Sequence, residues 1–475
     1  MARVQGGRTG GETSVSVADP AVTTTRAILT DLFGAPQERG FAVRLWNGLV
    51  ESPTDASAGT APFTLILTRS GSLRRALMPP SELSLVEAFI DGDIEIQGDL
   101  ESAAGLGDRL AARIDSIGAA ARVMWRAMAL PRDRDERTGG AQGIRDPKIH
   151  GLLRLGRRHS EARDARAVRF HYDVSNDFYA LWLDHRMVYS CAYFDDGVRD
   201  LDQAQEAKLD YVCRKLRLKP GERLLDIGCG WGGLIIHAAE RYGVTAVGIT
   251  LSERQAAWAR ARIAEAGLAA RVRVEVADYR RYSDAAPFDK IASVGMVEHV
   301  GIERLPDFFT GAFRLLAPGG LFLNHGIVSI EEARPRPLRA RIEGRLWRRG
   351  AFMGKYVFPD GNLVASSSVV ACAEAAGFEL RDVESLRDHY ARTLRLWLAR
   401  LEARQSEAIP IVGEQIYRVW RLFLASSAYG FRVGRIGVIQ SVLAKPDAAG
   451  WVPLPMTRRD LYEDTPRAVR DRLAG

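Results

Sequence analysis

The sequence predicts an α/β protein whose larger part is a doubly wound, mostly parallel sheet, preceded by a small N-terminal α+β domain. Three observations predict this fold class. From Lys219 onward, strand-like runs alternate with helical patterns, as in parallel sheets with crossover helices. The first of these runs ends in a turn rich in glycine. Upstream of about residue 125, short strands and helices occur without that alternation, so we expect two domains in the 475 residues.

Composition excludes several classes of protein. Hydrophobic residues make up 47% and charged residues 26% of the chain, unlike a disordered or fibrous protein. The four cysteines lack the spacing of a zinc site and the density of a disulfide framework, so we expect no metal. No apolar run reaches the roughly 18 residues of a membrane span, and the N-terminus lacks a signal sequence, so we expect a cytoplasmic protein.

The small α+β domain is expected at residues 20–125. A flexible tail rich in Gly, Ser and Thr precedes it at 1–19, and a charged linker with little periodicity follows it at 126–167. Its elements are predicted from apolar periodicity. The strands lie at 41–48, 63–69 and 94–99, and the helices at 72–78 and 82–92.

The larger domain is expected at residues 168–445, with a C-terminal tail at 446–475. Helical patterns separate its first strands. The predicted strands are 222–228, 245–250, 271–278, 290–295 and 321–328, and candidates at 378–386 and 435–444 extend the sheet at one edge. Apolar residues also recur at helical spacing at 394–401 and 416–427, so we expect two helices packed over the sheet.

A glycine-rich loop follows the first strand of the larger domain, in the segment Leu224–Gly233. Its glycines formally fit the G-x-G-x-x-G pattern of dinucleotide-binding dehydrogenases. Asp226 counts against a dinucleotide because its carboxylate would repel a pyrophosphate, and the second strand ends in Thr250 without an acidic residue for a ribose. A carboxylate here suits a zwitterionic cofactor with an ammonium group and a sulfonium, and S-adenosylmethionine is such a cofactor.

Further candidate ligands follow the next strands, where α/β sheets bind their ligands. Asp278 and Tyr279 end the third strand and are suited to accept a hydrogen bond from an adenine amino group and to stack on its ring. Thr250 and Gln255 are suited to reach the ribose hydroxyls. Taken singly, each is more often an ordinary turn or helix-start residue, but their positions at successive strand ends support one another.

With the loop goes a set of motifs that resembles the cyclopropane-fatty-acyl-phospholipid synthase family, which includes the mycolic acid cyclopropane synthases. The likeness covers residues 168–445 in unbroken order. The motifs are His171–Tyr179, Tyr189–Phe194, Gly248–Ser252, Gly295–Gly301 and His389–Leu394. The resemblance implies a class I methyltransferase fold with a helical lid, which adds a methylene from S-adenosylmethionine across a cis double bond of a lipid acyl chain.

The resemblance also implies roles for individual residues. The positions that match S-adenosylmethionine contacts are Tyr189, Ser190, Gly228, Gly230, Thr250, Gln255, Asp278 and Tyr279. The positions that match a pocket for a bicarbonate ion are Cys191, Glu298, His325, Ile327 through its backbone, and Tyr390. One departure concerns the second set, because the family's usual His-Thr-Ile appears here as His325-Gly326-Ile327, preceded by Asn324 instead of an apolar residue.

The implied chemistry explains these residue types. An alkene is a weak nucleophile, so proximity to an electrophilic sulfonium methyl is needed, and the product is a carbocation that closes to a ring on losing a proton. Bicarbonate held by Glu298, His325 and Tyr390 would be the base. Water must be excluded because it would quench the cation. The candidate aromatic walls are Tyr172, Phe178, Tyr193 and Tyr279.

A net charge of +7 favours an acidic partner, either nucleic acid or an anionic membrane. Residues 334–349 place seven Arg against one Glu with apolar residues interleaved, which suits an anionic membrane surface. We find no nucleic-acid-binding module and expect no nucleic acid partner. The expected partners are unsaturated phospholipid acyl chains at the inner face of the cell membrane, with peripheral association, and a homodimer is kept as a candidate assembly.

Three function classes stay open at this point. The first is a cyclopropane synthase acting on phospholipid acyl chains. The second is a C-methyltransferase that leaves a methyl or methylene branch, which follows if the proton leaves a chain carbon. The third is a catalytically silent lipid-binding protein on the same scaffold, against which Glu298, His325, Tyr390 and the glycine-rich loop argue.

Overall fold

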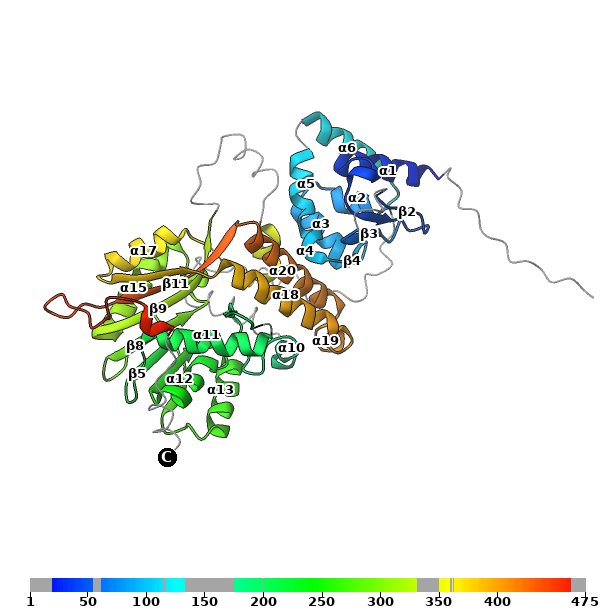
Figure 1. The fold of residues 1–475 in the computed structure, drawn as a ribbon. Coiled ribbons are helices and arrows are strands. Elements are labelled where there is room, and N and C mark those ends of the chain that lie inside the picture. Colours follow the sequence, from blue (N-terminus) through cyan, green and yellow to red (C-terminus); the bar gives the residue numbers. More distant parts are fainter. Residues whose placement is uncertain are drawn as a thin grey trace, which may run out of the picture. The chain divides into compact units, whose positions relative to one another are not determined.

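The computed structural model describes residues 19–53, 61–113, 117–132, 175–198, 200–330, 350–358, 361 and 363–462. The chain forms two compact units, the first holding the described residues 19–132 and the second those from 175 onward (Figure 1). Residues 171–174 and the Arg-rich segment 334–349 lie outside the described residues. Within the described part, no helix combines the length and the apolar character that a membrane crossing needs.

The first unit is a small α+β fold, as predicted. Its four-stranded sheet has the order β2-β1-β3-β4. The strands are β1 (Ala42–Arg44), β2 (Val50–Glu51), β3 (Phe63–Leu67) and β4 (Ile94–Gly98). The helices are α1 (Pro20–Phe33), η1 (Pro36–Glu38), α2 (Ser72–Leu77), α3 (Glu82–Ile90), α4 (Leu100–Ala104), α5 (Leu106–Arg113) and α6 (Ile117–Ala129). Helix α6 runs through residues 126–129, which we had assigned to the linker.

The second unit is built on a seven-stranded sheet of order β10-β11-β9-β8-β5-β6-β7. Strands β5 to β9 are parallel, and β11 and β10 add antiparallel strands at one edge, where the sequence predicted them. The strands are β5 (Arg223–Ile227), β6 (Thr245–Thr250), β7 (Val272–Val276), β8 (Phe288–Val294), β9 (Leu316–Ser329), β10 (Glu379–Ser385) and β11 (Ile436–Ala444).

Helices cover both faces of this sheet, and alternate residues of each strand feed two apolar cores. On β5, Leu224 joins the core beneath α11, α12 and α13, and Leu225 joins the core beneath α15 and α17 (Figure 1). In chain order, the helices that precede β9 are α10 (Asn176–Ala180), α11 (Leu201–Leu216), α12 (Gly233–Tyr242), α13 (Glu253–Glu265), α14 (Val297–Val300), η2 (Ile302–Arg304) and α15 (Leu305–Leu315). They are followed by η4 (Met353–Val357), α17 (Ser366–Ala375), α18 (Arg387–Ala403), α19 (Gln405–Val412), α20 (Glu414–Arg432) and η5 (Arg459–Leu461).

Helices α18 and α20 contain the two apolar stripes that predicted helices at 394–401 and 416–427. They pack side by side and form the helical lid (Figure 1). Beneath them lies an aromatic cluster in which Trp182 contacts Trp397 and Trp420, with ring centroids 5.6 and 5.4 Å apart. The cluster joins the lid to the segment just before the predicted cofactor residues Tyr189 and Ser190.

Residues 446–462, which we expected to begin a C-terminal tail, pack on the second unit. Val452 and Leu461 are buried. The guanidinium of Arg217 is 2.7 Å from Asp460, and that of Arg458 is 2.7 Å from Asp382. These contacts extend the folded unit to the end of the described chain.

The packing of Gly248 yields a stability prediction. A Cβ atom at Gly248 in β6 would lie 2.7 Å from Cys229 Sγ and 2.8 Å from Ile235 Cδ1, so Gly248→Ala should cost ~1–3 kcal/mol through overpacking. The matched control is Gly311→Ala in α15, whose added Cβ meets nothing within 4 Å, and which should be neutral or stabilising by ~0.5–1 kcal/mol. Thermal denaturation of both variants checks this, and a Tm for Gly248→Ala at or above the wild-type value would contradict the packing argument.

Candidate functional site

The glycine-rich loop between β5 and α12 forms because its glycines take left-handed backbone angles. Gly228 and Gly232 have φ values of +86° and +85°, which other residues adopt only with strain. The N–H groups of Gly228 and Cys229 both donate to the carbonyl of Ile249 on β6, at 2.9 and 3.0 Å. These hydrogen bonds fix the loop between the ends of β5 and β6. The backbone of the loop leaves space above the sheet.

A cavity opens above this loop at the carboxyl ends of β5, β6, β7 and β8. Most of the predicted cofactor residues line it, namely Tyr189, Ser190, Asp226, Gly228, Gly230, Thr250, Gln255 and Tyr279. The sequence analysis did not single out other lining residues, among them Lys208, Trp231, Arg280, Met296 and His299. The structure therefore brings side chains from four strand ends and from α11 to one place.

Two buried ionisable groups, one acid and one base, line this cavity. Burial raises the pKa of Asp226 to about 7, against which the nearby Lys208 acts, and Asp226 Oδ1 has no hydrogen-bond partner among the described residues. Burial lowers the pKa of Lys208 to about 8, opposed by Asp184, Cys191 and Asp226. The Lys208 ammonium donates to Ser190 Oγ at 3.0 Å. The cavity is thus complementary to a ligand that carries both an ammonium and a carboxylate.

Thr250 and Gln255 occupy the position expected for ribose contacts. The Thr250 hydroxyl donates to Gln255 Oε1 at 2.8 Å, and both side chains are buried. Ser252 holds the start of α13 by accepting from the Gln255 N–H at 3.3 Å. Thr250 and Gln255 therefore present a hydrogen-bonded hydroxyl and amide next to the end of β6.

We expected Asp278 to present its carboxylate to the cavity, but it is not among the residues that line the cavity. The guanidinium of Arg280 occupies both its oxygens, with Nε 2.8 Å from Oδ1 and Nη2 2.5 Å from Oδ2. This ion pair lowers the pKa of Asp278 against the effect of its burial. Ala277, Tyr279 and Arg280 line the cavity at this strand end, and Tyr279 is held edge-on against Phe308 at 5.3 Å.

A second group of polar side chains lies next to the cavity on β9 and α14. Glu298 follows the cavity-lining residue Met296, and its Oε2 is buried without a hydrogen-bond partner among the described residues. Burial raises the pKa of Glu298 to about 7, opposed by the backbone groups of Glu298 and Ile327. Burial therefore favours the protonated form of this carboxyl group.

Gly326 explains how β9 approaches α14 so closely. A Cβ atom there would lie 3.0 Å from Val297 Cβ and 3.4 Å from Glu298 Oε2. The departure from the family's usual threonine thus leaves space beside the Glu298 carboxyl. Asn324, the second departure, is fully buried, and its side-chain amide has no partner among the described residues.

His325 on β9 is held by a neighbouring strand. Its Nδ1 is 3.0 Å from Gln440 Nε2 on β11, and its Nε2 has no partner within the described part of the chain. Burial and the nearby Lys208 and Lys215 lower the pKa of His325 to about 3, so the ring is neutral at physiological pH.

Cys191 and Tyr390 both form a hydrogen bond to the carbonyl of Leu386, just before α18. The Cys191 thiol is fully buried and donates to the carbonyls of Ala192 and Leu386, at 3.3 and 3.7 Å. Burial raises its pKa, so it is not a nucleophilic thiolate. The Tyr390 N–H donates to the same Leu386 carbonyl at 3.0 Å, and its ring packs on Phe431 at 4.7 Å.

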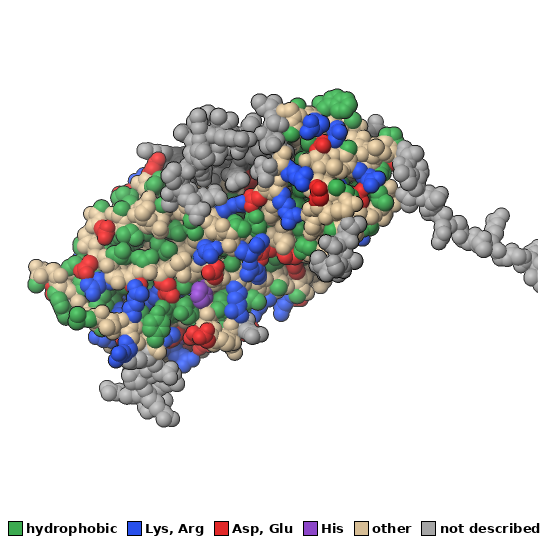
Figure 2. Space-filling view, turned by 45° about the horizontal axis from the view of Figure 1, so that its top comes forward, with side chains coloured by type: hydrophobic (Ala, Val, Ile, Leu, Met, Phe, Trp, Pro, Cys, Tyr) green, Lys and Arg blue, Asp and Glu red, His purple; other side chains and the backbone are tan. Residues whose placement is uncertain are grey.

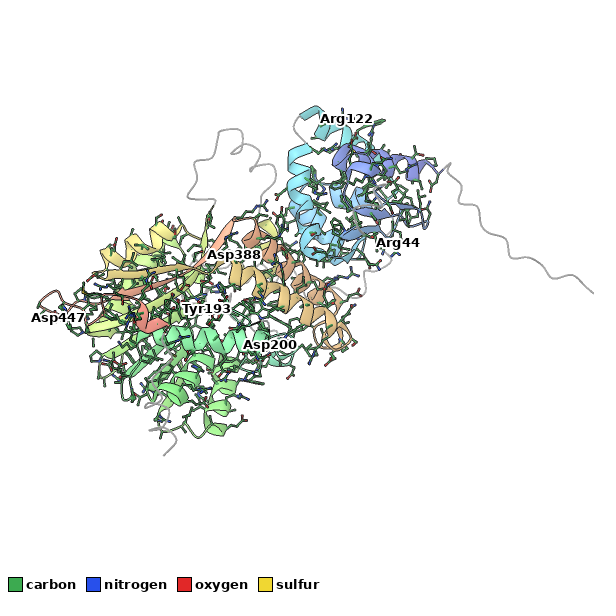
Figure 3. The ribbon with its side chains drawn as sticks, viewed as in Figure 1. Arg44, Arg122, Tyr193, Asp200, Asp388 and Asp447 are labelled. Atoms are coloured by element: carbon green, nitrogen blue, oxygen red, sulfur yellow. The ribbon has the colours of Figure 1, made fainter. Side chains whose placement is uncertain are left out.

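The aromatic walls we predicted are distributed differently. Tyr172 lies outside the described residues. Phe178 is fully buried in the cluster with Trp182 and Trp420, and Tyr193 stacks on His389 at 4.8 Å beside α11 (Figure 3). Of the predicted aromatic walls that the structure describes, Tyr279 lines the cavity.

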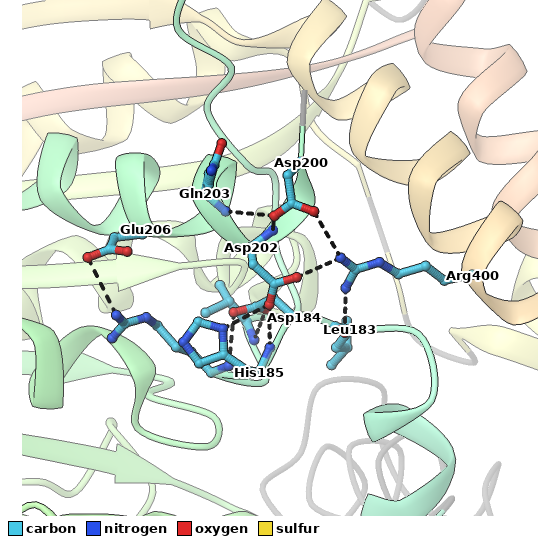
Figure 4. A network of polar contacts seen from close by, with 10 residues as sticks. Leu183, Asp184, His185, Asp200, Asp202, Gln203, Glu206 and Arg400 are labelled. Carbon is cyan, nitrogen blue, oxygen red and sulfur yellow. Dashed lines mark hydrogen bonds and ion pairs between the residues drawn. The ribbon is translucent and has the colours of Figure 1, made fainter. Parts of the chain in front are cut away.

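A polar network braces the segment that carries Tyr189 and Ser190 (Figure 4). Arg400 on α18 donates to Asp202 Oδ2 at 2.6 Å and to the carbonyl of Leu183 at 3.0 Å. Asp202 also accepts from the His185 N–H at 2.8 Å, and Asp184 accepts from the backbone N–H groups that follow it. Asp184, His185 and Asp202 lie close enough together to be metal ligands. The carboxylate oxygens of Asp184 and Asp202 already accept these hydrogen bonds, so we assign the three residues the role of supporting the segment that carries Tyr189 and Ser190.

Comparison with known proteins agrees with the motif assignment. A family model described as mycolic acid cyclopropane synthetase matches residues 159–441. The chain is 40% identical over 422 residues to a probable fatty acid methyltransferase of Pseudomonas putida, covering 88% of this chain and 95% of that protein. It is 39% identical over 281 residues to cyclopropane mycolic acid synthase 1 of Mycobacterium tuberculosis, covering 58% of this chain and 96% of that protein.

A solved structure shares the fold of the second unit. Mycolic acid cyclopropane synthase CmaA1, complexed with SAH and CTAB, aligns with a TM-score of 0.55 and 38% sequence identity, covering 59% of this chain and 98% of that one.

Proposed function

The chain belongs to the mycolic acid cyclopropane synthetase family, and we propose that it transfers a methylene from S-adenosylmethionine to the cis double bond of an unsaturated phospholipid acyl chain. It is a class I methyltransferase that depends on S-adenosylmethionine and modifies lipid acyl chains. The observation that carries the finer proposal is the pairing of a cavity suited to a zwitterion with a buried acid–base group at Glu298 and His325.

The cavity fits S-adenosylmethionine because its charges are complementary to the methionyl end of the cofactor. The Asp226 carboxylate, whose Oδ1 has no partner among the described residues, would hold the ammonium group, and Lys208 with Ser190 would hold the carboxylate. Thr250 and Gln255 would contact the ribose, and Tyr279 would stack on the adenine. Asp278 would reach the adenine amino group only after Arg280 releases it.

This arrangement predicts how two substitutions affect binding. Lys208→Met and Asp226→Asn should each weaken S-adenosylmethionine binding by about 10- to 100-fold, because each removes a hydrogen bond between charged groups. Calorimetry measures this directly. The matched ligand is 5′-methylthioadenosine, which lacks the amino-acid end, and neither substitution should change its affinity. If both ligands lost affinity equally, the substitutions would be acting through the fold.

The bound cofactor supplies a methyl group on a sulfonium, which is electrophilic enough for an alkene to attack when the two are held in place. In the proposed reaction the π electrons of the double bond would form the new C–C bond as the S–CH₃ bond breaks, which would leave a cation on the chain. Loss of a proton from the new methyl closes the ring. The lid helices α18 and α20 and the aromatic cluster of Trp182, Trp397 and Trp420 would exclude the water that would quench that cation.

The residues beside the cavity fit a small anionic base such as bicarbonate. His325 Nε2 and Glu298 Oε2, which are buried and have no partner in the described part of the chain, are suited to bind an oxyanion, the first as a neutral donor and the second when protonated. Bicarbonate bound here would supply the base for the departing proton. Tyr390 on α18 and Cys191, in the segment before α11, would border this pocket, and Ile327 would contribute its backbone.

The product distinguishes the proposal from its alternatives. Cells expressing the protein with unsaturated phospholipids should gain one CH₂ per modified acyl chain by mass spectrometry, and NMR of the isolated lipid should show cyclopropane protons. The control is Glu298→Ala, which should lower the yield by ~10²–10⁴-fold if the pocket binds the base.

Other outcomes identify the other functions. Branched methyl or methylene signals in place of ring signals would establish C-methylation, which the Pseudomonas putida relative's description also allows. Unchanged lipid masses would indicate a lipid-binding protein.

We also propose peripheral association with the inner face of the cell membrane. Its support is the composition of residues 334–349, with seven Arg against one Glu. On the face seen in Figure 2, the described Lys and Arg side chains are interspersed with Asp and Glu. Residues 334–349 carry a higher density of positive charge than other parts of the sequence, so we propose that this segment contacts anionic head groups.

Neutralising Arg345, Arg348 and Arg349 should weaken binding to anionic vesicles by up to ~1 kcal/mol per charge. Flotation across a series of anionic lipid fractions measures this, and the loss should shrink as salt rises because a Debye length of about 8 Å at physiological ionic strength screens surface charges.

The control for that experiment removes the same net charge elsewhere. Arg241, Arg262 and Arg304 are exposed, with side-chain exposures of 58%, 45% and 41%, and their triple neutralisation should leave flotation unchanged. Equal flotation of both triple variants at low salt would overturn the membrane role of residues 334–349.

A further inference from the structure

A chain of buried hydrogen bonds runs from the edge of the sheet to His325. The Lys215 ammonium on α11 lies 2.5 Å from Glu384 Oε2 on β10 and 2.8 Å from Gln440 Oε1 on β11. Gln440 Nε2 lies 3.0 Å from His325 Nδ1. Gln440 and His325 are direct partners in the antiparallel pairing of β11 with β9, which accounts for their contact.

The chemistry of these groups fixes the direction of every hydrogen bond. A lysine ammonium only donates, so it must face the amide oxygen of Gln440 and not its NH₂ group. The amide NH₂ then faces His325 and can only donate, which makes Nδ1 an acceptor. A neutral imidazole whose Nδ1 accepts carries its single proton on Nε2.

We propose that Lys215 and Gln440 are positioning residues that hold His325 as a neutral Nε2–H donor, aimed at the anionic base of the proposed reaction. His325 Nε2 is buried and has no partner among the described residues, so its proton is available to a bound oxyanion. The inference rests on the proposed function, and it adds the tautomer and the residues that impose it. Without the Lys215 contact, the Gln440 amide could rotate and offer its oxygen, which would move the proton to Nδ1.

The charged groups around His325 favour the same neutral state. Lys208 and Lys215 of α11 disfavour a proton on the ring, and burial acts in the same direction. Glu384 on β10 is paired with Lys215, and Glu298 on α14 lies beside the neighbouring residue Gly326. The ring is therefore neutral, and the Gln440 contact decides which nitrogen carries the proton.

The test uses the full-length protein with ¹⁵N-labelled histidine. NMR of the wild type should assign His325 to the Nε2–H tautomer, and Gln440→Glu should shift it to Nδ1–H, because a carboxylate accepts from that nitrogen. Gln440→Met, which removes both interactions, should give a mixture. A wild-type Nδ1–H form, or a Gln440→Glu spectrum unchanged from wild type, would overturn the proposal.

Turnover provides the second measurement. Relative to wild type, Gln440→Glu should lose about 10- to 100-fold in kcat at pH 8, with S-adenosylmethionine affinity unchanged, because a hydrogen bond to a charged group is lost. Much of that loss should be recovered at lower pH, since the new carboxylate favours an imidazolium with protons on both nitrogens. A loss that did not vary with pH would indicate a merely structural role and overturn the positioning role.

The control is Ser441→Ala, which removes the neighbouring buried bond from Ser441 Oγ to the Asn324 carbonyl and should leave the His325 tautomer unchanged. If the wild type gave no lipid product, the proposed function would fail, whereas the NMR measurement would still decide the tautomer.

Discussion

The site depends on two lysine ammonium groups that helix α11 buries against the sheet. Lys208 and Lys215 are one helical repeat of seven residues apart, so they lie on the same face of α11, and each is nearly inaccessible to solvent. Lys208 reaches Ser190 and lies near Asp226 in the cofactor cavity, while Lys215 reaches Gln440 and through it His325. A buried ammonium without partners is costly, so the polar groups around these two lysines are constrained in place. One helix thereby orients both the cofactor end and the acid–base end of the site.

Much of the site could be predicted because its signals are local. The loop at Gly228 and Gly230 requires left-handed backbone angles that glycine supplies, and the cavity residues Thr250 and Tyr279 follow strand ends that the alternating pattern located. The strands of the parallel sheet could be located for the same reason, since strand patterns alternate there with helical patterns.

Long-range contacts account for what the sequence did not reveal. From the sequence alone, Lys208 and Lys215 cannot be distinguished from solvent-exposed lysines on an amphipathic helix, because their hydrogen-bond partners Ser190 and Gln440 lie 18 and 225 residues away. Asp278 was expected to face the cofactor, and no pattern indicates that Arg280, two residues on, turns back to occupy it. Residues 446–462 carry no strong periodicity, yet burial of Val452 and Leu461 anchors them. In each case the deciding contact is tertiary.

The burial that keeps water from a cation also sets the charges of the two carboxyl groups. Asp226 and Glu298 both have pKa values raised to about 7 by desolvation, so burial favours the protonated form of each carboxyl group. An ammonium bound to Asp226 would lower its pKa, and an anion bound beside Glu298 would raise the pKa of that group further. Loading would therefore drive the two carboxyls apart, with Asp226 ionised and Glu298 protonated, each in the state that holds its own ligand. Burial also keeps the His325 ring neutral. The orientation of the Gln440 amide, and not the pH of the solution, therefore determines whether Nε2 of His325 carries the proton that an anion would accept.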